Sequence, residues 1–446
     1  MTKHLTNAGY GVLDYVSYPI GMLLVAPVVL HKLGSAEYGL WMIATAAISA
    51  GGIIASGFVD ACTQRVAHLR GTGQVALMGH AIRSMLGINL TIGLVLALGV
   101  WIAAPYAASR VADSELTPPA ECLLSLRVAS VAILVRAIES VPVGAQRAFE
   151  RYRATVQIST AMRFATLGLA ALLALAGRGV ASILVVTAVL LALGTAMQFR
   201  ELSKLMDRMS FLPTFHAGET RLLVGRGFFV WLQALGGVVF GHLDRILLGV
   251  SLGALAVTPY SLCVQFAHPI YGLTASGLNF LFPYLSSRTN SLSDAGLKRT
   301  ILKAFLCNLA LVTCGAVFLL FAGNTLIRVW SGPAVAQRAA SVLPPVVVGS
   351  ALMGLSVTGT YALQALNQFK TVAVITLTAR AAMLLLMIEM LRHAGVQGLA
   401  YARLLYGSAA LIVYLPLLQK LNAAKNGRNH ASRLAIPIEV QEGSNP

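Results

Sequence analysis

Long stretches without charged residues alternate along the chain with short clusters of arginine and lysine. No Asp, Glu, Lys or Arg occurs between Arg83 and Arg110, or between Lys303 and Arg328. A helix needs about 20 mainly apolar residues to cross the hydrocarbon of a bilayer, and these stretches are long enough. We therefore expect an all-α polytopic membrane protein. The pattern predicts twelve spans, over residues 8–31, 39–62, 82–106, 122–147, 153–176, 180–200, 222–250, 254–286, 299–322, 339–364, 369–392 and 396–420.

The composition agrees with a membrane protein. Of the 446 residues, 57% are hydrophobic and only 11% are charged, whereas soluble domains keep about a quarter of their residues charged. The five cysteines show neither CxxC nor Cys/His ligand spacing, so we expect no disulfide framework, no metal and no cofactor. The sequence contains no nucleotide-binding P-loop motif. Any driving force is therefore expected from an ion gradient, the substrate gradient or another protein.

The net charge of +17 could indicate a nucleic-acid partner, but the distribution of the basic residues favours another explanation. Basic residues gather in alternate connections between the spans, while the opposite connections carry mostly single ones. Cytoplasmic loops of membrane proteins are rich in lysine and arginine in this way. We therefore expect both termini in the cytoplasm and no nucleic-acid partner. The connections assigned to the cytoplasm contain Arg65, Arg70, Arg83, Arg147, Arg151, Arg153, Arg200, Lys204, Arg208, Arg221, Arg288, Lys298, Arg299 and Lys303.

Features of the first half of the chain recur in the second half. The Leu33-Gly34 turn recurs as Leu252-Gly253, an offset of 219 residues. Six spans in each half give the two halves the same orientation in the membrane, as in the parallel repeats of many transporters. We therefore expect two parallel six-helix repeats around a central cavity. Further matches pair Gly52, Ala55, Ser56 and Gly57 with Gly272, Ala275, Ser276 and Gly277, and residues 149–153 with 366–370.

The repeat divides the chain into four segments. They are an N-terminal six-helix half (1–200), a cytoplasmic linker (201–221), a C-terminal six-helix half (222–421) and a polar cytoplasmic tail (422–446). The linker carries Phe211, Leu212 and Phe215 among charged residues, which indicates an amphipathic stretch at the membrane surface. Because the two halves already supply an interface to each other, we expect a monomer.

Two arginines, Arg163 and Arg380, lie about ten residues inside apolar helices and fall on each other at the repeat offset of 217. An arginine at this depth costs several kcal/mol unless it faces a cavity or a partner. Neither has a carboxylate three or four residues away in its own helix. One interpretation is a structural bridge to Asp14, Asp60, Glu139 or Asp244. We favour a cavity that receives an anion, because guanidinium groups bind phosphate in a forked, bidentate manner.

Other charged residues inside the predicted spans extend this hypothesis. Arg136 and Glu139 are three residues apart and therefore share one helix face. They can form an internal salt bridge, or Glu139 can couple transport to a proton, with Arg136 assisting Arg163 and Arg380 at the substrate. Asp60 and Asp244 are further candidates for ion coupling. We expect Arg403, near a helix end, to reach the membrane interface, and we place Glu389 at the interface as well.

Two short motifs resemble one family of transporters. Residues 33–41 (LGSAEYGLW), followed by Ser56-Gly57-Phe58 and Arg65, resemble the first two spans of polysaccharide-biosynthesis flippases. Residues 244–249 (DRILLG), followed by Leu252-Gly253, resemble the DR-x-x-LG element of the family's seventh span. These flippases belong to the multidrug, oligosaccharidyl-lipid and polysaccharide exporter (MOP) superfamily.

The resemblance implies transport, in which no covalent bond is made or broken. It implies that an undecaprenyl-pyrophosphate-linked oligosaccharide is flipped across the bacterial inner (plasma) membrane by alternating access, for O-antigen, capsule or exopolysaccharide assembly. The implied partners are this lipid-linked substrate, the lipid bilayer, and the polymerase and chain-length proteins of the same assembly.

Two other functions make different demands on the sequence. An ion-coupled exporter of drugs or small amphiphiles on the same fold is the main alternative, although an exporter of cationic drugs needs a net anionic cavity. A membrane polymerase or glycosyltransferase would need large polar loops with catalytic groups, and the connections here are too short for it.

Overall fold

The structure is a computed structural model that describes residues 2–112, 117–206, 209, 211–278, 281–286, 294–366 and 368–421. Most of its side chains are described from Gly21 onward. The predicted tail (422–446) lies outside these residues. Within the described part of the chain the structure is helical, with no β-strand, as expected for a protein whose backbone groups must be satisfied inside a bilayer.

The first half contains six helices. They are α1 (Thr2–Ser56), α2 (Val59–Gly71), α3 (Val75–Val111), α4 (Pro119–Ala148), α5 (Tyr152–Leu175) and α6 (Val180–Leu205). The second half begins with α7 (Ala217–Val238), which continues through a π-helix (Val239–Leu243) into α8 (Asp244–Leu252). It goes on with α9 (Ala254–Gly277), α10 (Leu281–Ser286), α11 (Asp294–Ser331), α12 (Pro333–Ala339), α13 (Leu343–Ala365) and α14 (Phe369–Ala410).

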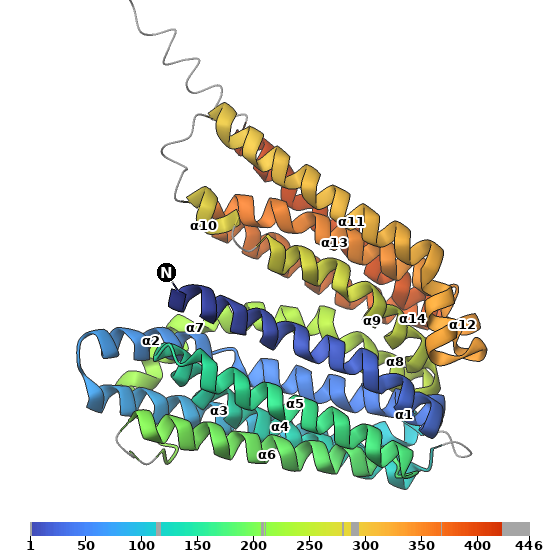
Figure 1. The fold of residues 1–446 in the computed structure, drawn as a ribbon, viewed down its shortest axis with the longest axis horizontal. Coiled ribbons are helices and arrows are strands. Elements are labelled where there is room, and N and C mark those ends of the chain that lie inside the picture. The colour runs from blue at the N-terminus through green and yellow to red at the C-terminus, as the bar shows by residue number, and fades with distance from the viewer. Residues whose placement is uncertain are drawn as a thin grey trace, which may run out of the picture.

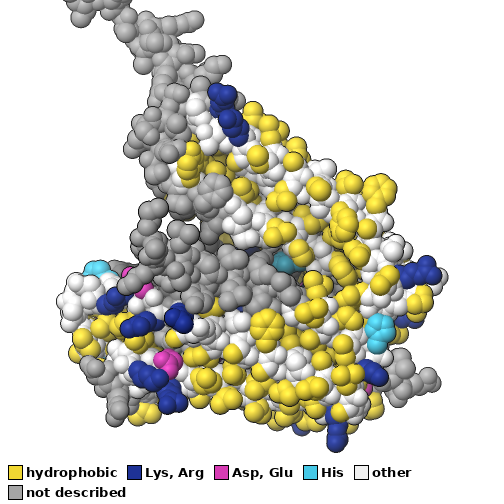
Figure 2. Space-filling view, viewed as in Figure 1, with side chains coloured by type: hydrophobic (Ala, Val, Ile, Leu, Met, Phe, Trp, Pro, Cys, Tyr) yellow, Lys and Arg dark blue, Asp and Glu magenta, His cyan; other side chains and the backbone are white. Residues whose placement is uncertain are grey.

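Eight helical stretches in the described chain are long and apolar enough to cross a membrane. α1 and α14 are longer than one span, and each contains a glycine with non-helical backbone, Gly34 in α1 and Gly395 in α14. The space-filling view shows hydrophobic side chains over the middle of the molecule and Lys and Arg near its ends (Figure 2). Exposed apolar side chains such as Ile102 and Phe321 suit contact with lipid. The protein is thus a multi-pass membrane protein, and the count of twelve spans stays a prediction.

The helices form two bundles that meet at one end and diverge toward the other (Figure 1). α1–α7 form one bundle and α9–α14 the other, with α8 and α12 at the meeting end. There, Thr258 donates a hydrogen bond to the carbonyl of Ser35 at 2.6 Å, and Tyr38 donates to Gln265 at 3.4 Å. Gly39 lies so close to α9 that a Cβ would overlap the carbonyl oxygen of Ala254. This close approach requires glycine and brings α1 against α9.

Backbone breaks recur in the two halves. Gly34 (φ 86°, ψ 173°) and Gly253 (φ 80°, ψ 170°) have nearly the same conformation and are 219 residues apart. Gly177 and Gly395, 218 residues apart, both have positive φ. L-residues with a side chain rarely adopt this conformation, so glycine marks the same turn in each half.

A buried hydrogen-bond arrangement also recurs. Asn89 of α3 donates from Nδ2 to the carbonyl of Ala137 (3.0 Å) and to the serine hydroxyl one turn later (2.7 Å). Asn308 of α11 donates to the carbonyl of Gly354 (3.0 Å) and to the threonine hydroxyl one turn later (3.0 Å). Both asparagines are almost fully buried. These matched contacts support the repeat, while the segment boundaries remain predictions.

Candidate functional site

Arg163 of α5 and Arg380 of α14 occupy corresponding positions of the repeat, and both side chains are half-buried. Arg380 packs against α7, where a Cβ on Gly236 would lie 2.7 Å from the Arg380 Cδ. Arg163 is one turn before Leu167, whose side chain contacts Gly21 of α1. The absence of a side chain at Gly236 leaves room for the arginine stem. Thus Arg380 borders α7, and the helix that carries Arg163 packs against the corresponding first part of α1.

Arg136 and Glu139 form the predicted ion pair on α4. Arg136 Nη1 lies 2.5 Å from Glu139 Oε2, and the Arg136 side chain is 42% exposed whereas that of Glu139 is 10% exposed. The Arg136 stem lies against Gly52 of α1, where a Cβ would be 2.6 Å from Cγ. The salt bridge is therefore confirmed. A coupling role for Glu139 stays a prediction, and the accessible guanidinium leaves the pair open to water or a ligand.

A second ion pair, which the sequence did not reveal, lies inside the second half. Arg403 Nη1 lies 2.6 Å from Asp244 Oδ2, and the two side chains are 2% and 0% exposed. Tyr260 of α9 donates a hydrogen bond to the same oxygen at 2.7 Å. The other oxygen, Oδ1, accepts from the backbone N–H of Arg245 at 2.8 Å. Asp244 is thus held by three helices, α8, α9 and α14.

Our expectation that Arg403 reaches the membrane interface is wrong. Its side chain turns inward to Asp244, which is 159 residues earlier in the chain. A buried guanidinium needs a counter-charge, and this carboxylate supplies it. Ion coupling at Asp244 stays a prediction that would require this pair to open. Glu389 is exposed, as expected, and pairs with His393 at 2.8 Å.

Asp60 is exposed in the first turn of α2, apart from both ion pairs.

Another contact, which sequence reasoning missed, joins α2 and α7. Arg65 donates to both carboxylate oxygens of Glu219, at 3.0 and 2.6 Å. The hydrogen bonds to Glu219 raise the pKa of Arg65 above its usual value. Because the two residues are 154 positions apart, no spacing rule could have paired them.

Aromatic contacts strengthen the connection between α7 and the first half. Trp231 of α7 donates from Nε1 to the carbonyl of Ile54 at 2.9 Å. Its ring stacks on Phe58, with 5.6 Å between the centroids. A Cβ on Gly57 would come within 2.7 Å of the Trp231 side chain. The beginning of α7 therefore packs with the first half, whereas α8 is tied through Asp244 to the second.

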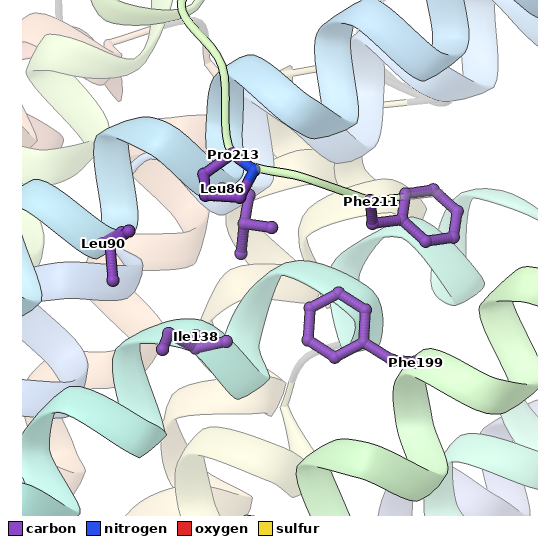
Figure 3. Close-up of a pocket in the computed structure, with 6 residues that line it drawn as sticks. All are labelled: Leu86, Leu90, Ile138, Phe199, Phe211 and Pro213. Atoms are coloured by element: carbon purple, nitrogen blue, oxygen red, sulfur yellow. The ribbon is translucent and has the colours of Figure 1, made fainter. Parts of the chain in front are cut away.

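An apolar cavity of about 260 Å³, with no charged residue in its lining, lies in the first half (Figure 3). Two of its lining residues, Phe211 and Pro213, come from the part of the linker (211–216) that is not helical. Thr214 donates from its backbone to the carbonyl of Arg83 at 3.3 Å. A lining without charged groups does not suit a pyrophosphate head group. The remaining lining residues are Leu86, Leu90, Ile138 and Phe199.

Comparison with known families identifies the chain at this point. The model of a family described as polysaccharide biosynthesis protein matches residues 32–337, more than half of the chain. The chain belongs to this family. The resemblance of its glycine turn and DR-x-x-LG element to polysaccharide-biosynthesis flippases is thereby confirmed at the level of the family. No curated protein sequence matches this member of the family.

Solved structures of MOP superfamily transporters share the fold of this polysaccharide biosynthesis protein. Lipid II flippase MurJ in an inward closed conformation has 13% identity and a TM-score of 0.72, with 92% of this chain and 87% of MurJ covered. An inward-facing multidrug resistance MATE family transporter has 14% identity and a TM-score of 0.64, with 93% and 99% covered. A MOP superfamily transporter from Pyrococcus furiosus has 15% identity and a TM-score of 0.55, with 92% and 96% covered. At these identities the likeness establishes the fold alone.

Proposed function

We propose that this protein is a flippase that moves an undecaprenyl-pyrophosphate-linked oligosaccharide across the bacterial inner membrane. The product would serve O-antigen, capsule or exopolysaccharide assembly. The observation that carries the proposal is the match to the polysaccharide biosynthesis family over residues 32–337. The similarity of the fold to that of a lipid II flippase agrees with it. The step is translocation, so no bond is made or broken.

The arginines give the proposal a physical basis. The pyrophosphate head must pass the bilayer midplane, where an uncompensated charge costs several kcal/mol. Arg380 borders α7, Arg163 lies on the helix that packs against α1, and Arg136 is accessible on α4. We assign these three arginines to the head group, which they would hold through charge-assisted hydrogen bonds while the prenyl tail stays in lipid. The two halves would rock about their contacts at the meeting end.

The orientation and driving force complete the proposal. The distribution of basic residues supports cytoplasmic N and C termini, so the diverging end of the bundles, where the N-terminus lies, would face the cytoplasm (Figure 1). Glu139, beside Arg136, is our first candidate for an ion-coupling carboxylate, followed by Asp60 and Asp244. We expect the protein to work as a monomer, in contact with the polymerase and chain-length proteins.

Complementation of a strain that lacks its own flippase tests the proposal. We expect Arg163→Ala and Arg380→Ala each to reduce surface polysaccharide roughly tenfold or more, because one bidentate phosphate contact is lost. Arg178→Ala, an exposed arginine outside the predicted spans, is the matched control and should complement normally. Full complementation by the double variant at normal protein levels would refute the assignment of these arginines.

The same fold could export drugs or small amphiphiles, as the MATE family neighbour does. Assays with cationic dyes separate the two functions. A flippase with a cationic cavity should not change dye accumulation, whereas dye efflux that depends on Glu139 would favour the exporter.

A further inference from the structure

Several buried nitrogen atoms in the second half have no hydrogen-bond partner among the described residues of the chain. They include Nδ1 of His242, in the π-helix, and Nε of Arg245, in α8. Most buried polar atoms in proteins are hydrogen-bonded, so such exceptions require an explanation. π-helical turns occur often at functional sites. Together these observations direct attention to the segment where α7 passes into α8.

Asp244 does not neutralise its neighbour Arg245. One oxygen of the Asp244 carboxylate accepts from Arg403 and Tyr260, and the other accepts from the backbone of Arg245. Consecutive residues on a helix point about 100° apart, so the Arg245 guanidinium lies away from this carboxylate. With one carboxylate and two arginines, the group keeps at least one net positive charge.

A third nitrogen-containing side chain, that of His268 on α9, lies near His242 and Arg245. His268 is exposed, although it belongs to a span. It follows Gln265, the partner of Tyr38 on α1, by about one turn toward the diverging end. His268 therefore lies nearer the diverging end than the contact of α9 with Tyr38.

Arg245 also faces the first half. Residues four apart share a helix face, and Gly249, four positions after Arg245, lies against Ile43 of α1. Arg380 contacts Gly236, six positions before His242 and nearer the diverging end of the molecule. His242 and Arg245 thus lie between the Arg380 contact and the meeting end of the two halves.

We infer that His242, Arg245 and His268 form a second phosphate-binding site, deeper between the halves than Arg380. The inference rests on the proposed function and adds to it a second position for the pyrophosphate of the substrate. The unpartnered His242 and Arg245 nitrogens would donate to phosphate oxygens, and His268 would contact the group from the other side. A pyrophosphate that leaves Arg380 toward the meeting end would reach this site next.

Binding of inorganic pyrophosphate to the purified full-length protein in detergent, measured by calorimetry, tests the inference. The measurement uses a background with Arg136→Ala, Arg163→Ala and Arg380→Ala, so that none of the three arginines assigned to the head group contributes. We expect binding in this background. We expect Arg245→Gln to weaken it roughly tenfold, because the bidentate contact between the guanidinium and the phosphate is lost. His242→Gln and His268→Gln should each weaken it by a smaller factor.

Arg127→Gln is the matched control, since Arg127 is also an arginine within a span. Its guanidinium lies 4.9 Å from the ring centroid of Trp101, in the first half, so its removal should leave binding unchanged. Arg245→Lys keeps the charge and loses the fork, and it should bind weakly while retaining the elution profile and thermal stability of the background. This variant separates a lost ligand contact from a folding defect.

Three results would overturn the inference. They are no pyrophosphate binding in the background, unchanged binding after Arg245→Gln, and an equal loss after Arg127→Gln. None of them decides the proposed function, which is judged by complementation with the Arg163 and Arg380 variants. Conversely, the second site would stand if the background bound pyrophosphate through Arg245 and complementation showed that another substrate is carried.

Discussion

Among the described residues, each half of the molecule contains an intramembrane ion pair, Arg136–Glu139 or Asp244–Arg403, and these two pairs differ in accessibility. In Arg136–Glu139 the arginine is 42% exposed, whereas in Asp244–Arg403 the side chains are 2% and 0% exposed. At the repeat offsets, Arg136 corresponds to Met353 and Asp244 to Val25. The repeat therefore preserves the backbone, its asparagine contacts and the Arg163/Arg380 position, but not the two ion pairs. An accessible pair can exchange its partner for water or substrate, while a buried pair joins helices.

The largest effect should come from breaking the buried pair. Arg403→Ala leaves Asp244 charged and unpaired in the interior, which should cost about 3–5 kcal/mol of stability. The midpoint of thermal unfolding in detergent checks this, with Arg136→Ala as the matched control. Replacing both partners, with Asp244→Leu and Arg403→Met, should recover much of the loss. If Arg403→Ala were no worse than Arg136→Ala, the contrast between the pairs would be unfounded.

An intermediate effect should come from the contacts that the two halves share. Asn89→Ala and Asn308→Ala each remove a buried amide that donates to a carbonyl and a hydroxyl. Each should cost about 1–3 kcal/mol, and the two costs should be similar because the geometry is repeated. Unfolding of the two single variants side by side tests this. A large difference between them would mean that the matched contacts do not carry matched energies.

The smallest effect on stability should come from the accessible pair. Glu139→Gln removes an ion pair whose arginine is already in contact with solvent, so stability should fall by at most about 1 kcal/mol. Transport should nevertheless decrease if Glu139 couples it to a proton. Unfolding and complementation measured on the same variant separate these effects. Normal complementation would remove Glu139 from the list of coupling residues and leave Asp60 and Asp244.

The site could be predicted only in part. The Arg136–Glu139 pair followed from a spacing of three residues, because neighbours on one helix face must lie close together. Arg403–Asp244 and Arg65–Glu219 could not be found in this way, since each joins helices distant in the chain. Arg245 belongs to the DR-x-x-LG motif, which is visible in the sequence. Whether its Nε has a hydrogen-bond partner depends on which side chain pairs with Asp244 in the folded protein, and that side chain is Arg403.

By itself the sequence determined the membrane class, the helical character and the turns at Gly34 and Gly253. These depend on the hydropathy and backbone freedom of residues close together in the chain, and the bilayer accepts few alternatives. Only the tertiary structure decided that Arg403 turns inward and that α7 packs with the first half while α8 is tied to the second. The partner of each buried charge is a side chain from a distant part of the sequence. Which side chain becomes the partner is determined by how the helices pack.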